Sequence, residues 1–536
     1  MKSLLSLILV SILFLCLNAG FSENPKTGSG NPMQVSVGNS ISEKVFFFGV
    51  NNSWGAGKMD PTQKKVQDIL KQLQVRSLKF PGGAISNFWN LSEGRFVHEL
   101  QIREFHNKKW ANRFEKMAKR TPAFPSDKLK PFSFYETCFL TKINPVWVLN
   151  LVTESSDKSQ KQITNMKTLN ITPKYIELGS ELDKGIFIVN FPTPEKYLQQ
   201  AKPAISKIRE LFPAAKIAVC ASGVDMGDQK QAQENQKLFP NLKDRFEKWN
   251  TELFKFREDY DAWIVRPSSF TSQRFENVKK EKWQQICLVF PEAIMGNMAK
   301  TSREKFKSIP LWLTDFNMTF QLESTENQAH EPFFQNLKNS PLHGFHVAGY
   351  FLSAIANGDI FEIMHYNNLI GADGLGMIRL APGKSTSKQG PKLQVNPAAQ
   401  IFAIFSKLAQ KAGMHQLEIK SGEFLDLNLL GRNNFHPLQG AAFTSVDSLA
   451  VVILNRSKQS QSIDLGDKEF LSSMKKTIYK IDPEPRETWA DLTKDFPSKG
   501  PLIPQTQEIK VSPEKPLITD VPGFSLIILE GKLTEI

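Results

Sequence analysis

The residues best suited to chemistry are carboxylic acids that directly follow short apolar runs. Residues 175–179 form one such run and are followed by Ser180 and Glu181. Residues 311–314 form another and are followed by Asp315. A carboxyl group can donate a proton, accept one, or attack as an ionised nucleophile. Hydrolysis of a glycosidic bond uses two such groups, one protonated beside the leaving oxygen and one ionised beside the anomeric carbon.

Amide, aromatic and glycine residues follow the other apolar runs, and this combination suits a sugar. Sugars offer apolar faces that stack on aromatic rings and hydroxyls that hydrogen-bond to amides. Arg266 adds a guanidinium, which pairs bidentately with carboxylate or sulfate groups. The candidate substrate-binding residues are Asn51, Trp54, Gly82, Gly83, Asn87, Trp89, Asn150, Ser180, Arg266 and Tyr366.

These residues need a scaffold that brings the ends of many strands together. Short β-branched or aromatic runs alternate with segments of helical period, which favours a parallel sheet with crossover helices. The eight predicted strands are residues 45–51, 75–80, 146–151, 175–179, 216–221, 262–265, 311–314 and 360–365. The pattern predicts an α/β fold, a (β/α)8 TIM barrel, whose working residues project from the carboxyl ends of the strands.

A second domain is predicted after the last amphipathic helix, residues 396–413. From residue 414 to 536, short alternating strands are separated by turn residues, which is typical of an antiparallel β-sandwich. We therefore expect a barrel domain over residues 45–413 and a sandwich over 414–536. Residues 23–44 are expected to be a linker with one strand, 33–37, that joins the sandwich.

Several segments resemble a known group of enzymes. Residues 175–181, Tyr-Ile-Glu-Leu-Gly-Ser-Glu, are similar to the Glu-Leu-Gly-Asn-Glu signature of clan A glycoside hydrolases, whose final Glu is the general acid/base. Residues 78–83, 148–151 and 313–317 look like stretches of the α-L-arabinofuranosidase-like and heparanase-like families, and residues 451–457 resemble their sandwich. The resemblance covers nearly the whole chain after its first residues. It implies that Glu181 is the acid/base and that Asp315 stands at the nucleophile position.

The chain departs from this family pattern at three positions: Asp315 replaces a Glu, Ser180 replaces the Asn that binds the sugar 2-hydroxyl, and Arg266 stands where relatives often have His. Losing one methylene retracts a carboxylate by about 1.5 Å. Retaining enzymes hold their carboxyl groups ~5–5.5 Å apart and inverting enzymes ~6.5–9.5 Å apart. A retaining enzyme with a shifted backbone, an inverting enzyme, and a former enzyme that only binds glycan all remain open. Alone, Asp315 also fits a loop-capping residue and Glu181 a salt-bridge partner.

The N-terminus predicts export. Residues 1–22 hold a lysine, an apolar run and a stretch of small residues, which is a signal peptide pattern. A secreted or periplasmic location is expected, with no stable membrane span, because no later run approaches ~20 apolar residues. Cys138, Cys220 and Cys287 remain after the signal, too few and too scattered to predict a disulfide framework.

The net charge and the absence of certain sequence motifs limit the classes of binding partner that we expect. The net charge of +13 is explained best by a merely basic, solvated surface, and together with Arg266 it leans weakly toward a carbohydrate that is acidic or sulfated. No nucleic-acid-binding motif, metal-ligand spacing or phosphate loop is found, so nucleic acid is not expected and no cofactor is required. The leading hypothesis is a glycoside hydrolase. The alternatives are a catalytically silent carbohydrate-binding protein and a structural surface protein.

Overall fold

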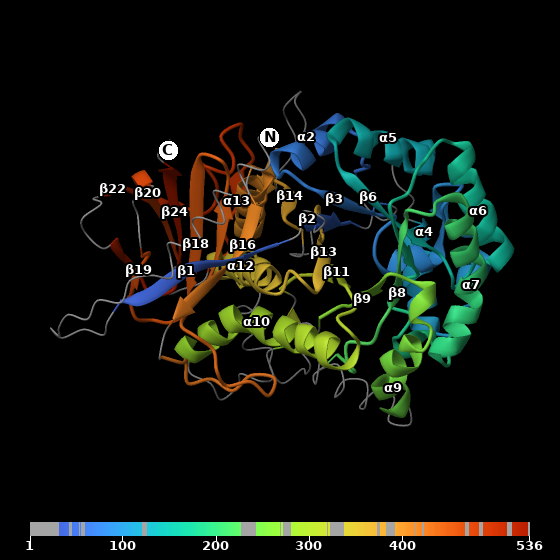
Figure 1. Ribbon diagram of the computed structural model, residues 1–536. Coiled ribbons are helices and arrows are strands. Elements are labelled where there is room, and N and C mark those ends of the chain that lie inside the picture. Colours follow the sequence, from blue (N-terminus) through green and yellow to red (C-terminus); the bar gives the residue numbers. More distant parts are fainter. Residues whose placement is uncertain are drawn as a thin grey trace, which may run out of the picture.

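The chain folds into a closed parallel barrel and a large antiparallel sheet, which lie side by side (Figure 1). The computed structural model describes residues 32–533 except 42–45, 53, 55–58, 120–125, 227–242, 268–269, 272–279, 319, 322–336, 372–375, 382–391, 412, 421–422, 467–470, 482–485 and 512–516. The predicted signal peptide lies outside the described residues.

Eight parallel strands close the barrel in the order β11-β13-β2-β3-β6-β7-β8-β9. Their bounds are β2 (Phe46–Asn51), β3 (Ser77–Phe80), β6 (Asn144–Leu149), β7 (Tyr175–Leu178), β8 (Lys216–Cys220), β9 (Ala262–Ile264), β11 (Leu311–Phe316) and β13 (Phe361–Asn367). Each lies within or overlaps one of the eight apolar runs, so the predicted TIM barrel is confirmed. Runs of this kind become barrel strands because both faces of a parallel sheet are buried.

Helices cover the outside of the barrel. They are α2 (Lys64–Gln72), α5 (Pro131–Thr141), α6 (Ser156–Thr168), α7 (Pro194–Leu211), α9 (Lys243–Phe254), α10 (Lys280–Lys305), α12 (Pro341–Ala356) and α13 (Pro397–Lys411). Local signals start two of them: the side chains of Ser155 and Thr193 accept hydrogen bonds from the first turns of α6 and α7. An insertion after β3 adds α3 (Glu99–Arg103), α4 (Lys108–Lys119) and the hairpin β4 (Trp89–Asn90) with β5 (Arg95–Phe96).

The second sheet has nine strands in the order β22-β20-β24-β18-β17-β16-β1-β19-β23. They are β1 (Met33–Ser40), β16 (Gly413–Lys420), β17 (Leu438–Thr444), β18 (Ser448–Asn455), β19 (Gln461–Asp464), β20 (Leu471–Lys480), β22 (Gln505–Ile509), β23 (Ile518–Val521) and β24 (Ser525–Leu533). Strand β1 pairs with β16 and β19, so the start of the described chain joins its end. Two short pairings stand apart: β10 (Phe270–Thr271) with β12 (Phe320–Gln321), and β15 (Leu393–Val395) with β14 (Ile378–Leu380) and β21 (Ala490–Asp491).

Helices α12 and α13 lie between the barrel and the sheet and contact both (Figure 1). Helix α12 is apolar nearly all round, as a helix buried on two sides must be. Arg456 of the sheet forms an ion pair with Glu292 of α10, and Gln439 donates to Ser353 of α12 over 3.0 Å. The two parts therefore meet through specific polar contacts as well as apolar ones.

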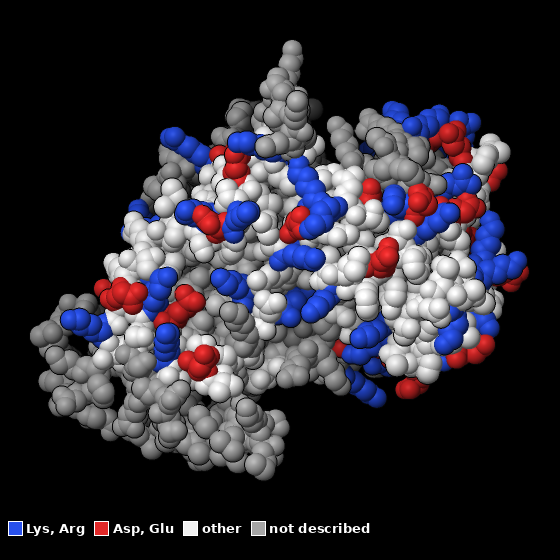
Figure 2. Space-filling view, turned by 90° about the horizontal axis from the view of Figure 1, so that it is seen from above, with Lys and Arg blue, Asp and Glu red and all other residues white. Residues whose placement is uncertain are grey.

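Two surface properties bear on partners. No helix in the described ranges is both long and apolar enough to cross a membrane. Figure 2 shows basic and acidic side chains intermingled over the described part of one face. On that face the positive net charge is spread out and does not form one basic patch.

Candidate active site

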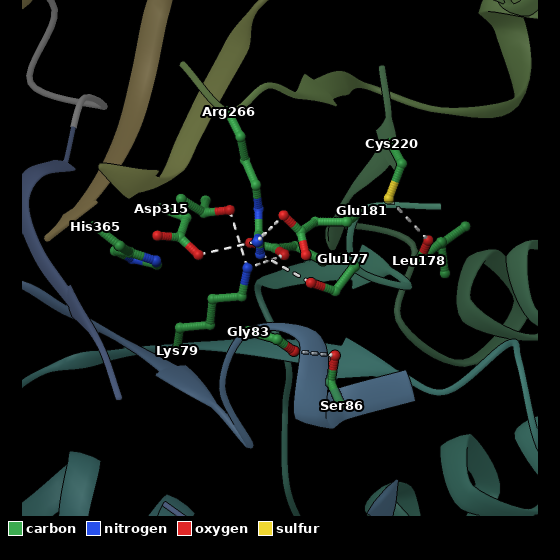
Figure 3. A network of polar contacts seen from close by, with 12 residues as sticks. Lys79, Gly83, Ser86, Glu177, Leu178, Glu181, Cys220, Arg266, Asp315 and His365 are labelled. Carbon is green, nitrogen blue, oxygen red and sulfur yellow. Dashed lines mark hydrogen bonds and ion pairs between the residues drawn. The ribbon is translucent and has the colours of Figure 1, made fainter. Parts of the chain in front are cut away.

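Arg266 joins the two candidate catalytic acids at the carboxyl end of the barrel. Its Nη1 lies 2.9 Å from Oε1 of Glu181 and 2.9 Å from Oδ2 of Asp315, and its Nη2 donates to Oγ of Ser180 over 2.8 Å. Figure 3 shows the guanidinium entering between the two carboxylates. We call these four residues the mouth cluster. The Arg266, Glu181 and Asp315 side chains are 12%, 21% and 18% exposed, so solvent reaches the cluster.

The shared contact limits the separation of the acids. Both carboxylate oxygens lie 2.9 Å from one nitrogen, so at most twice that distance, about 5.8 Å, separates them, which is below the ~6.5–9.5 Å of inverting enzymes. While Arg266 bridges the two acids, the loss of a methylene at Asp315 therefore does not separate these two oxygens by the wide gap that an inverting mechanism needs for its water.

The loop after β7 is held so that Glu181 faces Asp315. Asn87 uses both ends of its amide on the Ser180 backbone: its Nδ2 donates to the carbonyl over 2.7 Å, and its Oδ1 accepts from the N–H over 3.1 Å. Glu181 itself has a φ of 59°, in the left-handed region that costs a non-glycine residue on the order of 1–3 kcal/mol. Residues held in such conformations concentrate at functional sites.

Asn51 and Gly83 complete the surroundings of Asp315. A Cβ atom on Gly83 would lie 3.4 Å from Nδ2 of Asn51, 3.5 Å from Oδ2 of Asp315 and 3.7 Å from Nη2 of Arg266. The Asn51 side chain is buried, yet neither its nitrogen nor its oxygen has a hydrogen-bond partner among the described residues. A buried amide without partners is costly, so it is a group that a ligand hydroxyl would satisfy.

A second charged group lies deeper in the barrel. Lys79 of β3 reaches across to Glu177 of β7, 2.5 Å from its Oε2, and donates to Oγ1 of Thr314 over 3.0 Å. We call these three residues the deep cluster. The Lys79 and Glu177 side chains are both 0% exposed. Thr314 directly precedes Asp315, so the deep cluster supports the strand that carries that acid.

His365 belongs to the barrel core and does not reach the mouth. Its Nε2 lies 2.9 Å from Oγ of Ser77, and a Cβ on Gly49 would stand 2.0 Å from its ring. Only glycine at position 49 leaves room for this ring. Burial holds the pKa of His365 well below its ordinary value, so the ring is neutral.

Charge controls the protonation of the mouth cluster. Burial on its own raises the pKa of Glu181, but the positive charges of Arg266, Lys184 and Lys79 outweigh it, and the pKa lies below its ordinary value. Burial on its own lowers the pKa of Arg266, but the negative charges of Glu181 and Asp315 raise it by more, and the pKa lies above its ordinary value. The guanidinium therefore stays charged. With Arg266 in place, Glu181 is therefore an ionised carboxylate.

The structure brings together seven of the predicted site residues and places the others elsewhere. The first group is Glu181, Asp315, Ser180, Arg266, Asn51, Gly83 and, through the Ser180 backbone, Asn87. Gly82 lies next to Gly83 in the loop after β3 and has a φ of 139°.

The remaining predicted sugar contacts pack into the protein. Trp54 is fully buried and donates to the carbonyl of Lys79 over 3.1 Å, and the Trp89 ring packs against Phe80 and Phe96. Rings packed in this way present no free face to a sugar.

Asn150 and Tyr366 are also engaged elsewhere. The Asn150 amide caps the following loop at Val152 and Thr153. The Tyr366 hydroxyl lies 3.2 Å from Nε2 of His343 on α12, so its side chain points to the helix layer. This placement does not support the predicted convergence of Trp54, Asn150 and Tyr366 on the cleft.

The deep cluster was not among the predicted site residues, although the sequence carries a signal for it. Lys79 and Glu177 are charged residues inside runs that are otherwise buried, at 77–80 and 175–178. Charged residues are rarely fully buried unless they are paired. Lys79 on β3 and Glu177 on β7 have only β6 between them in the barrel, so two such positions indicate an ion pair across its interior. Within the described ranges, no group of three or more His, Cys, Asp or Glu could hold a metal ion.

Comparison with known proteins supports the fold. No protein-family model and no curated protein sequence matches this chain. Among solved structures, the α-L-arabinofuranosidase of Thermotoga maritima in complex with arabinose aligns with a TM-score of 0.61 at 15% identity, over 94% of this chain and 100% of that one. The fold is shared. The family 51 α-L-arabinofuranosidase of Bifidobacterium longum gives 0.64 at 11% identity, over 94% and 99%.

A second group of glycoside hydrolases has the same architecture. A family 44 xyloglucanase of Paenibacillus polymyxa aligns with a TM-score of 0.53 at 8% identity, over 93% of this chain and 99% of that one. The alignments span both the barrel and the sheet, so the predicted barrel with an attached sandwich is confirmed as one known arrangement. At these identities the likeness establishes the fold and not the reaction.

Proposed function

We propose that this protein is an exported glycoside hydrolase of the retaining type, with Glu181 as acid/base and Asp315 as nucleophile. The observation that supports it best is the pair of carboxylates at the carboxyl end of the barrel, whose two Arg266-bound oxygens are at most about 5.8 Å apart, a limit that admits the ~5–5.5 Å of retaining enzymes. The fold shared with arabinofuranosidases and a xyloglucanase agrees with a carbohydrate substrate.

The reaction would proceed in two displacements. In the first, Asp315 attacks the anomeric carbon, the bond to the leaving oxygen breaks, and Glu181 gives that oxygen its proton. In the second, water attacks the same carbon, Glu181 takes up the proton of the water, and Asp315 is released. The unpartnered Asn51 amide would bind a hydroxyl of the sugar bound beside Asp315.

Glu181 must be protonated for the first step, and this requirement constrains Arg266. While the guanidinium is paired with Glu181, the pKa of Glu181 lies below its ordinary value and the residue has no proton to give. The competent enzyme therefore needs Arg266 to leave Glu181 while Asp315 stays ionised.

The same contact favours a second candidate function, a glycan-binding protein without hydrolysis. If Arg266 never leaves the two acids, Glu181 cannot act as the acid and the mouth cluster can only bind, and Asn51 still offers its amide to a sugar. Predicted export and a carbohydrate partner are common to both candidates.

Release of reducing ends from a glycan panel, combined with glycan-array binding, separates the two functions. We expect the wild type to cleave at least one glycan, and Glu181→Gln to lose ~10²–10⁴-fold in rate on substrates with poor leaving groups while still binding. Asp359→Asn is the matched control, because Asp359 is also paired with an arginine, Arg303, but lies before β13 at the opposite end of the barrel. Binding without cleavage by the wild type would favour the second candidate.

A further inference from the structure

We propose that Arg266 is a latch, and that an anionic group on the sugar, a carboxylate or a sulfate ester, releases it. This inference rests on the proposed function, because it assigns the substrate class of that same site. In the resting state described above, Arg266 pairs with both acids. An anionic sugar would take the guanidinium as its own partner and free Glu181 to act as the acid.

Three contacts hold the latch, and all of them are at the tip of the side chain. Nη1 binds Glu181 and Asp315, and Nη2 binds Ser180, whereas Nε has no partner among the described residues. An arginine whose polar contacts are all made by its two terminal nitrogens can move its guanidinium without breaking a hydrogen bond at Nε. The side chain is 12% exposed, so a ligand entering from solvent can reach part of it.

Charge balance explains why an anion is needed. One guanidinium already serves two carboxylates. An anionic group can replace Glu181 as partner without adding charge to the cluster only if Glu181 takes up a proton at the same time. That protonated form is the one that acid catalysis requires. A neutral sugar gives Arg266 nothing to exchange, so Glu181 would stay ionised.

The other charged groups around Glu181 do not change this balance. Lys184 follows it on the same loop and Lys79 lies below, and both lower the pKa of Glu181. The Asp183 carboxyl is buried beside them, and burial raises its pKa. Lys79 is ion-paired with Glu177 in the buried deep cluster. Of Lys79, Lys184 and Arg266, it is therefore Arg266 that pairs with both Glu181 and Asp315.

Calorimetry with matched sugars tests the latch independently of hydrolysis. The probes form two matched sets: glucose, glucuronate and glucose 6-sulfate, and galactose, galacturonate and galactose 6-sulfate. Each sugar is titrated into the full-length protein near pH 6. The titration is repeated in two buffers of different ionisation enthalpy, so that the number of protons taken up on binding is measured. We expect at least one anionic sugar to bind ~10-fold or more tightly than its neutral counterpart, with net proton uptake; a tenfold change corresponds to about 1.4 kcal/mol. The carboxylate and sulfate members show which anion is preferred.

Variants separate the latch from a general effect of positive charge. Arg266→Met should lose both the preference for the anion and the proton uptake. Arg266→Lys, which keeps the charge but not the fork of donors, should retain only part of the preference. The matched control Lys184→Met removes a cation near Glu181 that is not ion-paired with either acid among the described residues, and it should keep both properties.

The outcomes are distinguishable from those of the proposed function. Anion-linked proton uptake without cleavage of any glycan would support the latch and reject the hydrolase. Cleavage with equal affinity for neutral and anionic sugars, unchanged in Arg266→Met, would overturn the latch and keep the hydrolase. If no anionic sugar binds more tightly than its neutral counterpart, the latch is wrong.

Discussion

The mouth cluster and the deep cluster contain the same kinds of charge in different surroundings. In the deep cluster one lysine meets one glutamate, both 0% exposed, and Lys79 also reaches Thr314. In the mouth cluster one arginine serves two acids that are 18–21% exposed. A sealed pair has no water to replace a lost partner, whereas an open cluster can exchange one partner for another. Solvent access therefore separates a group that supports the barrel from a group that can react.

The largest expected effect is on the rate of glycan cleavage, in variants of Asp315 in the mouth cluster. Asp315→Asn should lower the rate of glycan cleavage by roughly 10⁴-fold or more, the scale seen when a covalent nucleophile is removed. Asp315→Glu should also change the rate, because it moves the carboxylate by about 1.5 Å at a site where a ~1 Å misplacement can cost ~100-fold. Initial rates on the cleaved glycan give both values. Unchanged rates in both variants would remove Asp315 from the mechanism.

Substitutions in the deep cluster should lower the stability of the fold. Lys79→Met leaves the Glu177 carboxylate buried without its cation, so we expect a loss of about 3–5 kcal/mol in the free energy of unfolding, measured by urea denaturation. The double variant Lys79→Met/Glu177→Met should recover most of this loss, because no charge is left behind. A single variant as stable as the wild type would contradict the description of this pair as sealed.

Glu154 sharpens the comparison, because it is a buried carboxyl to which no cation of the described residues is hydrogen-bonded. It is 4% exposed and accepts a hydrogen bond from Gln162, and burial raises its pKa to about 7. The folded-state pKa lies above the unfolded value of about 4.5, so this group's stabilising contribution is present below pH 4.5 and is lost as the pH rises through 7. Glu154→Gln should therefore be more stable than the wild type at pH 8, by roughly 3 kcal/mol at most, and not at pH 4. Thermal melts at both pH values test this, and an equal effect at both would contradict it.

The smallest effect is expected at Asn51. Its amide has no described partner, so Asn51→Ala should change stability by less than about 1 kcal/mol while weakening binding of the glycan roughly tenfold. Asn87→Ala is the matched control, since that amide is used twice on the Ser180 backbone and its loss should lower stability instead. Calorimetric titration and thermal melts measure the two responses. Unchanged affinity in Asn51→Ala would separate Asn51 from the sugar site.

The sequence predicted the barrel strands well because each is a short apolar run between helical segments. It also located the mouth cluster, because the carboxyl ends of all strands in a parallel barrel meet at one face, whatever the conformation of the loops that follow them. It did not predict which strand-end side chains turn inward. Tyr366 and His365 are neighbours on β13, yet one faces α12 and the other the barrel interior. The Arg266 contacts with both acids depend on loop geometry that no local pattern encodes, and the predicted signal peptide and domain boundaries stay predictions.

Labelling of Asp315 tests the central claim most directly. Wild-type protein is incubated with 2-deoxy-2-fluoro glycosides, neutral and uronic, that carry a good leaving group, and its peptides are then analysed by mass spectrometry. A retaining mechanism predicts a glycosyl adduct on the peptide that contains Asp315, which is absent from Asp315→Asn. An adduct on another carboxylate, or no adduct from any sugar that the protein binds, would contradict the account.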